Sequence, residues 1–341
     1  MNIQIVTTPA NIDRSEWEEF VAHHPDGTIF QTPMMFESFQ EGRNHHPFMF
    51  AALGENRIKA ILSGVEIREY SGIPGKLTSR AIVWGGPIVE RNNQAIAEPL
   101  LQAYNESISK SAIFSQFRNL SCCNWLKPVF ESLGYTYEDH LNILIDLEKN
   151  EADLWSAIHG KRRNEIRRAT KEKTVFSVQV NDESLRKGYD ILREVYEYAR
   201  LPLPDISLFK SVLAHSTDES GLKIFTAKNG GEMIGVMFAL VFKKRIYDWY
   251  AGAYRSGLGK YPNDLIPWEV IRWGKARGYS LFDFGGAGKP NIPYGVRDYK
   301  LKFGGELVNY GRFEMIHQPL KMRLARMGFA LWRSRKGKQP G

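Results

Sequence analysis

The residues best placed to do chemistry lie between positions 279 and 305, around two pairs of glycines. An apolar run carrying Asp283 meets Gly285-Gly286, and a basic loop that includes Lys300 then leads to Gly304-Gly305. Glycines after a strand let the backbone turn and let a ligand approach the main chain, while nearby cations supply charge for phosphate groups. The alternative is a pair of tight turns flanked by solvated lysines.

The chemistry that this pattern suggests is attack by an amine on an activated acyl carbon. Such a reaction needs a group that accepts the proton of the amine and a donor that stabilises the oxyanion. Asp283, at a strand end beside two glycines, is the carboxylate best placed for proton transfer, although an aspartate there can also simply cap the turn. No Ser-His-Asp or Cys-His arrangement suggests a covalent nucleophile.

A second glycine-rich turn, Gly257-Leu258-Gly259, precedes a predicted helix. Asn263 or Asp264 fits its N-cap, Pro267 its first turn and Gly278 the position after its end. A helix N-terminus after glycines can bind an anion. The candidate substrate-binding residues here are Lys260, Tyr261 and Asn263.

These segments together resemble the C-terminal half of the FemA/FemB/FemX family, aminoacyltransferases that extend peptidoglycan side bridges. The matching motifs are Tyr261-Pro262-Asn263, Trp268-Glu269, Phe282-Asp283-Phe284-Gly285-Gly286, Lys300 with Phe303-Gly304-Gly305, and the basic run from Lys161 to Ala169. The resemblance covers residues 150 to 316 well and the first 150 loosely. It implies an α/β (α+β) fold of two tandem domains of the GCN5-related N-acetyltransferase (GNAT) type, each with a mixed, mostly antiparallel sheet flanked by helices.

The resemblance also implies roles for particular residues. Tyr299-Lys300 matches the family position where a lysine meets the reacting or phosphate-bearing end of the substrates, so Lys300 and Tyr299 join Asp283 as catalytic candidates, with Arg297 beside them for binding. The Gly257-Leu258-Gly259 run echoes the pyrophosphate loop of GNAT enzymes. However, Tyr254 stands where an arginine or glutamine is expected, which argues against a coenzyme A site.

A basic helix is predicted over residues 153 to 170. Arg162 falls on its apolar stripe, and Arg163 and Arg167 lie beside it. A buried arginine needs a partner, and its fork suits either a ligand phosphate or a carboxylate of the core. We take all three arginines as candidate substrate-binding residues, with a structural ion pair as the alternative for Arg162.

The chain has 341 residues, 43% hydrophobic and 25% charged, which suits a globular protein of two domains. Its start shows no signal peptide and it contains no long apolar run, so a cytoplasmic location is expected. Adjacent Cys122 and Cys123 suit a reducing compartment. No metal site is expected, because the two His-His pairs lack further ligands at suitable spacing.

The basic tail, residues 320 to 341, carries seven of the eight net positive charges and alternates them with apolar residues. Such a segment fits a membrane-surface anchor, at the inner face of the cell membrane, or a packed terminal helix. The expected division of the chain is a first GNAT-like domain over 1–148, a second over 149–318 and this tail from 319. Further expected elements are helices at 13–23, 93–111, 125–133 and 183–199, a hairpin at 48–68, and strands ending near Pro87 or lying at 113–120, 141–147, 222–228, 232–243, 245–254 and 306–316.

Three functions are compatible with these patterns. The first is transfer of an amino acid from charged tRNA, without a bound cofactor, to the amine of a phosphate-bearing peptidoglycan precursor. The second is an acyl-CoA-dependent N-acyltransferase acting on an amino sugar, and the third is a non-catalytic tandem domain that binds a cell-wall or RNA ligand. The long charged helical hairpin of FemA and FemB is not evident between 170 and 222, so the pattern favours the shorter FemX type.

Overall fold

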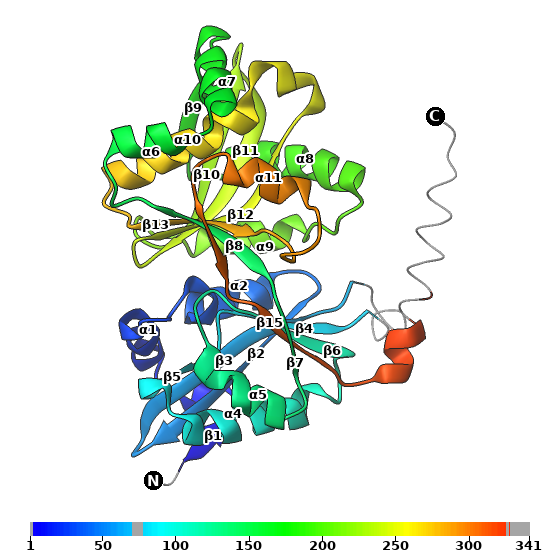
Figure 1. Ribbon diagram of the computed structural model, residues 1–341. Helices are drawn as coiled ribbons and strands as arrows, with labels where there is room; N and C mark the ends of the chain where they lie inside the picture. Colours follow the sequence, from blue (N-terminus) through cyan, green and yellow to red (C-terminus); the bar gives the residue numbers. More distant parts are fainter. Residues whose placement is uncertain (1–2, 70–77, 325–326, 328–341) are drawn as a thin grey trace. The chain divides into compact units, whose positions relative to one another are not determined.

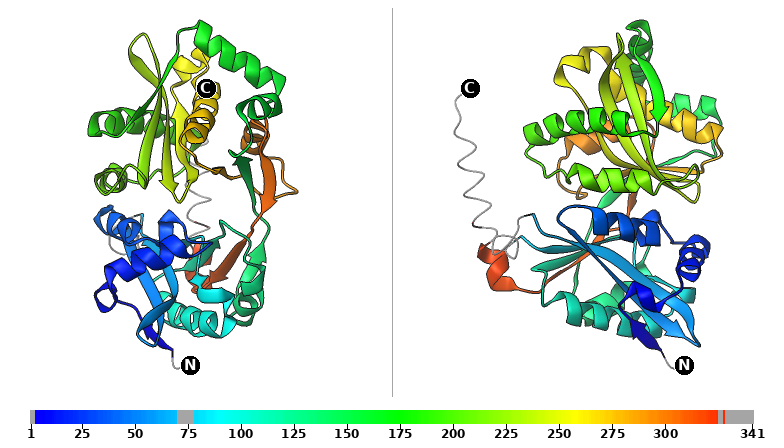
Figure 2. Two further views of the ribbon diagram at one scale, coloured as in Figure 1. Left: turned by 90° about the vertical axis from the view of Figure 1, so that its left-hand side faces the viewer. Right: turned by 180° about the vertical axis from the view of Figure 1, so that it is seen from behind.

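The computed structural model describes residues 3–69, 78–324 and 327. The chain divides into two compact units, one formed by residues 1–138 with 311–341 and the other by residues 139–310. Each unit contains one mixed sheet with helices on both faces (Figures 1 and 2). This confirms the predicted fold class.

The first unit is built on the sheet β1-β2-β3-β4-β6-β15-β7, with β5 paired to β3. Its strands in chain order are β1 Gln4–Val6, β2 His45–Gly54, β3 Arg57–Ile67, β4 Arg80–Trp84, β5 Ile88–Val89, β6 Phe114–Arg118, β7 Thr136–Glu138 and β15 Arg312–Ile316. Helices α4 (Gln94–Ile108) and α5 (Lys127–Ser132) pack on one face. Helices α1 (Arg14–His23) and α2 (Pro33–Glu41) lie on the other (Figure 1).

The second unit is built on the sheet β14-β8-β13-β12-β11-β10-β9. Its strands in chain order are β8 Leu141–Asp146, β9 Val175–Gln179, β10 Gly221–Asn229, β11 Glu232–Phe242, β12 Arg245–Ala253, β13 Leu281–Gly286 and β14 Glu306–Asn309. Helices α6 (Glu151–Ala157), α7 (Gly160–Lys171) and α10 (Pro262–Ala276) share one core face. Helices α8 (Asp182–Ala199) and α9 (Ile206–Ala214) cover the other, and α11 (Gly295–Leu301) follows β13.

The two sheets repeat the same order of strand directions. In each, an antiparallel hairpin leads to a strand that runs parallel to its next neighbour, β4 with β6 and β12 with β13. In each, the strand after that parallel pair comes from a distant segment, β15 in the first sheet and β8 in the second. The two tandem domains implied by the resemblance are therefore two copies of one topology.

The predicted domain limits differ from these units. Strand β8 pairs with β13 and β14, so the second unit begins at Asp139 and the limit at 148 is too late. The single strand expected over 306–316 is two strands in two sheets, because Gly311 adopts φ = +65° between them and breaks the ladder. The tail lies largely outside the described residues, and residues 319–324 are helical.

Three local predictions also need correction. The helix expected over 153–170 breaks at Ile158 and His159, where both residues take extended backbone angles and His159 caps α7. Helix α10 starts earlier than expected, with Tyr261 as N-cap and Pro267 inside it. Lys300 lies on helix α11 and not in a loop.

Candidate functional site

The sheet of the second unit opens where β12 and β13 stop pairing. Their parallel ladder ends at Tyr247 and Asp283. At this level β12 has an extra residue, Trp249, opposite β11, and β13 has Phe284 and Gly285 opposite a shorter stretch of β8. Bulges re-aim side chains and are frequent beside active sites.

The equivalent parallel pair in the first unit stays closed. Strands β4 and β6 pair along their whole length, and Gly85 N–H continues the ladder by donating to the carbonyl of Arg118 at 2.9 Å. Arg118 also lies over the ring of Trp84, 5.5 Å from its centroid. This difference between the repeats places the candidate site in the second unit.

Lys300 fills the opening between β12 and β13. Its Nζ donates to the carbonyl of Phe284 and lies 3.7 Å from a carboxylate oxygen of Asp248. Both side chains are largely buried, with 14% and 8% of their surface exposed. Burial raises the pKa of Asp248, and the neighbouring Lys300 opposes that shift. The site thus combines an ammonium donor with a carboxylate that can accept a proton.

This pair forms the floor of a pocket of about 720 Å³. Tyr299 and Asn263 also line it, so three of the predicted site residues meet here. The Tyr299 hydroxyl donates to the carbonyl of Asn263 and so ties α11 to the start of α10. The walls are largely apolar and aromatic: Tyr196, Val236, Met237, Trp249, Ala251, Ile266 and Pro267.

Asp283 is buried and does not line the pocket. Its carboxylate accepts the Gly285 N–H at 2.7 Å and lies 3.4 Å from the side-chain nitrogen of Asn142. Burial raises its pKa to about 6, although these hydrogen bonds oppose the shift. These contacts match the turn-capping alternative, and a part in proton transfer remains a prediction.

Arg162 makes the ion pair that was the alternative to phosphate binding. Its Nη1 pairs with Asp264 and lies 2.8 Å from Glu165, and its guanidinium lies 4.9 Å from the centroid of the Tyr299 ring. Burial raises the pKa of Asp264 to about 6 even though Arg162 opposes that shift. The arginine therefore supports the pocket from behind Tyr299.

The other predicted binding residues do not line the pocket. Arg163 donates to the carbonyl of Ser156, Arg167 lies over Trp155, and Lys260 pairs with Glu172 at 2.5 Å. Tyr261 accepts a hydrogen bond from Arg168, and Arg297 donates to the carbonyls of residues 287, 289 and 292. Arg297 thus holds the loop before α11 together.

Asp248 and the aromatic wall were not predicted from the sequence. A signal was available, since Asp248 is a lone acid inside the apolar and aromatic strand Ile246–Tyr250. A charge at such a position needs a partner or a function. Its partner, Lys300, is distant in sequence, and only the fold brings the two together.

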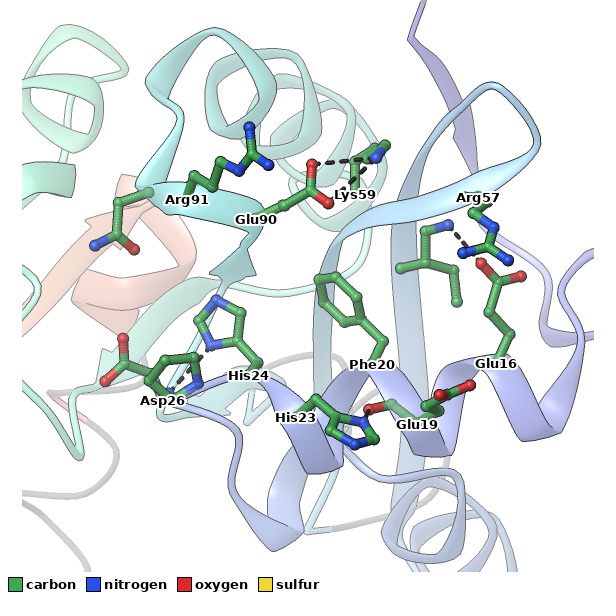
Figure 3. Close-up of a pocket in the computed structure, with 13 residues that line it drawn as sticks. Glu16, Glu19, Phe20, His23, His24, Asp26, Arg57, Lys59, Glu90 and Arg91 are labelled. Carbon is green, nitrogen blue, oxygen red and sulfur yellow. Dashed lines mark hydrogen bonds and ion pairs between the residues drawn. The ribbon is translucent and has the colours of Figure 1, made fainter.

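A second pocket, of about 540 Å³, lies in the first unit between α1, the start of β3 and the 3-10 turn Glu90–Asn92 (Figure 3). Among the charged residues that line it, Lys59 pairs with Glu90, and Glu16 accepts the Ile58 N–H. Within the described part of the chain, no group of three or more His, Cys, Asp or Glu side chains could hold a metal ion. None of the described helices is both long and apolar enough to cross a membrane.

Residues 160–301 match the family model of the acetyltransferase (GNAT) domain. The crystal structure of FemX superposes with a TM-score of 0.71 at 14% identity, over 95% of this chain and 100% of that one. The chain has the tandem GNAT fold of FemX. The resemblance seen in the sequence is thereby confirmed for the fold.

Two further solved structures share this FemX-like fold. The C-terminal domain of a putative lysylphosphatidylglycerol synthetase from Agrobacterium fabrum gives a TM-score of 0.57 at 14% identity, covering 92% of this chain and 94% of that one. A tandem GNAT protein from the clavulanic acid biosynthesis pathway gives 0.58 at 11% identity, covering 93% and 99%. No protein with a curated description matches the sequence significantly.

Proposed function

We propose that the protein is an acyltransferase that moves an amino acid from aminoacyl-tRNA to the amine of a peptidoglycan precursor peptide, at the cytoplasmic side of the membrane. The observation that carries the proposal is the opened parallel pair in the second unit, with Lys300 and Asp248 at the floor of an apolar pocket. FemX shares the fold, and the motifs around Lys300 resemble that family.

The proposed reaction is a direct displacement. The amine nitrogen attacks the ester carbonyl carbon, the C–N bond forms, and the bond to the ribose oxygen of the tRNA breaks. Asp248 accepts the proton of the attacking nitrogen, and this proton ends on the leaving oxygen. Lys300 faces the oxygen on which negative charge develops, where a preorganised donor contributes about 3 kcal/mol.

The exposed face of α7 and the turn that follows it support a polyanionic donor. Lys161, Lys171 and Lys173 make no ion pair within the described residues, and Arg167 and Arg168 point to neutral groups. This face continues to the pocket through Tyr261, which contacts Arg168 and leads into α10 beside Asn263. A phosphate backbone neutralises such a surface.

The glycine run Gly257-Leu258-Gly259 gives little support to the acyl-CoA alternative. A Cβ at Gly257 would lie 2.8 Å from the Cβ of Ile234, so close packing accounts for this glycine without a pyrophosphate. The nearby cations are engaged, Lys260 with Glu172 and Arg255 over the ring of Tyr198.

The test is a donor screen. Charged tRNA and acyl-CoA are each offered with an amine-bearing muropeptide or an amino sugar, and product is detected by mass spectrometry. We expect transfer from charged tRNA to the muropeptide. Turnover with acyl-CoA alone would overturn the proposal, and the absence of turnover with every pair would favour a binding module.

A further inference from the structure

Several large apolar side chains at the mouth of the Lys300 pocket are exposed. Five of its lining residues are large, apolar and well exposed: Tyr198, Leu201, Leu258, Tyr294 and Val296. They come from three separate segments, the end of α8, the 3-10 turn Arg255–Lys260 and the start of α11. Apolar groups from separate segments that gather at one mouth mark a ligand surface.

The pocket is therefore polar at its floor and apolar from the walls outward. The charged floor is Lys300 with Asp248, whereas Val236, Met237 and Ile266 line the walls below the rim. A hydrophilic substrate would leave Leu201 and Leu258 in water. An apolar chain that leaves the floor and runs to the mouth would bury them, which is favourable in proportion to the area covered.

The floor offers the Asp248 carboxylate as an acceptor for the group that it binds. Lys300 already donates to the Phe284 carbonyl and faces Asp248. The Asp248 carboxylate has no other hydrogen-bond partner in the described part of the chain, so it retains acceptor sites toward the pocket. A carboxylate with free acceptor sites in an apolar pocket is complementary to an ammonium group.

We propose that the pocket also accepts a primary amine at the end of a long, unbranched apolar chain, and that this amphiphilic amine is a second class of acyl acceptor. The inference goes beyond the peptide acceptor of the proposed function, and it rests on that function for the pocket and for the acyl donor. The ammonium group first gives one proton to Asp248. The neutral nitrogen then attacks the acyl ester carbon, an amide C–N bond forms as the ester C–O bond breaks, and a second proton of the nitrogen passes to the departing alcohol oxygen.

The experiment measures binding of n-alkylamines from butylamine to decylamine by calorimetry, below their micelle concentrations. We expect the dissociation constant to fall by up to about fourfold per methylene that reaches the walls. Decylamine should bind more tightly than decanol or decanoate of equal chain length. Equal affinity for butylamine and decylamine, or for decanoate and decylamine, would overturn the proposal.

A matched pair of variants tests where the alkyl chain of the amine lies. Leu201→Ser with Leu258→Ser removes rim residues that are 57% and 45% exposed, and should weaken decylamine binding about tenfold while sparing butylamine. The control, Val175→Ser with Val180→Ser, removes apolar residues that are 62% and 50% exposed and lie outside the pocket, and should change neither affinity. An unchanged decylamine affinity in the rim variant contradicts the assignment.

Two further measurements distinguish this inference from a bilayer-docking surface and from the proposed function. Binding to phosphatidylcholine vesicles that is lost in the rim variant, without binding of monomeric amines, would make the rim a bilayer-docking surface and overturn the proposal. Binding needs no acyl donor, so a failed donor screen with intact decylamine binding rejects the proposed function and the acceptor role but leaves the amine-binding site standing. Acylated decylamine from the donor that proves active completes the test, and its absence rejects the acceptor role.

Discussion

Lys300 and Asp248 depend on each other because both are largely buried. The side chains lie 3.7 Å apart, and Asp248 has no other ion-pair partner in the described residues. Removing one member of a buried pair leaves the other charge uncompensated, at a cost of about 3–5 kcal/mol. The lysine therefore contributes to stability as well as to the proposed chemistry.

We predict that Lys300→Ala lowers the free energy of unfolding by roughly that 3–5 kcal/mol at neutral pH and abolishes turnover. The double variant Lys300→Met with Asp248→Asn should regain most of the stability, because no charge is left unpaired, but it should stay at least about 100-fold less active. Urea denaturation and initial rates on both proteins measure this. Wild-type stability in Lys300→Ala would show that the pair is not coupled.

Asp283 should make stability depend on pH. Its folded pKa, about 6, lies above the ordinary value of 3.8, so the folded state favours the protonated form. That contribution is present below about pH 4 and is lost as pH rises through 6. Asp283→Asn keeps an acceptor for Gly285, and its stability relative to the wild type should grow between pH 4 and 7, by up to about 3 kcal/mol.

Thermal or urea melts from pH 4 to 7 test this expectation. Asp298→Asn, an exposed carboxylate on α11, serves as the control and should follow the wild type. Parallel profiles for the wild type and Asp283→Asn would show that the buried carboxylate is not the titrating group.

The sequence indicated individual candidate residues but not their contacts. Lys300, Tyr299 and Asn263 were named from local motifs and line one pocket, and their roles stay predictions. Asp248 was missed because its importance comes from a partner on another element, and Arg162 was placed on the apolar stripe without its carboxylate, Asp264, being known. Local spacing identifies chemical groups, whereas pairing across the fold decides what each can do.

At the scale of elements, the ion pair of Arg162 links α7 to α10. The guanidinium joins Glu165 on its own helix to Asp264 in the first turn of α10 and lies over Tyr299 of α11. Three helices thus meet at one planar cation, directly behind the pocket. Lysine keeps the charge but cannot make a fork or stack in the same way.

We predict that Arg162→Lys lowers the free energy of unfolding by about 1–3 kcal/mol, because a buried hydrogen-bonded pair loses part of its geometry. The matched control is Arg167→Lys on the exposed side of the same helix, which should change stability by less than about 0.5 kcal/mol. Urea denaturation measures both. A stable Arg162→Lys protein with weakened substrate binding would restore phosphate recognition as the role of this arginine.

The elements themselves were largely predictable where periodicity or caps are strong. Helix α8 and strands β10 to β12 lie where the patterns indicated. Short elements were missed, such as α2, β9 and α11, because a few residues carry little periodicity. The break at Ile158 and His159 was missed as well, since it depends on the His159 cap and on packing of Ile158 in the core.

At the scale of the whole molecule, the uneven charge makes a prediction about membranes. Residues 320–341 hold seven cations, and each contributes about 1 kcal/mol near an anionic surface. Deleting them should abolish most binding to anionic vesicles while sparing turnover of a soluble acceptor. Binding by the intact chain should weaken in 1 M salt, where the Debye length is about 3 Å. Equal co-sedimentation of both forms would remove the tail from membrane binding.

The second unit is one continuous segment, residues 139–310, between the two parts of the first unit. This division leads to a prediction about fragments. Residues 139–310 contain every strand of the second sheet, including β8 between β13 and β14. The division expected from the sequence, 149–318, omits β8 and leaves the facing edges of β13 and β14 unpaired. Unpaired buried backbone groups and the loss of Ile143 and Ile145 from the core should prevent folding.

We therefore expect fragment 139–310 to show a cooperative urea transition and dispersed amide resonances, and fragment 149–318 to aggregate or remain unfolded. Supplying β8 as a synthetic peptide of residues 139–148 should rescue the shorter fragment. Cooperative folding of 149–318 without the peptide would mean that the second unit folds without β8.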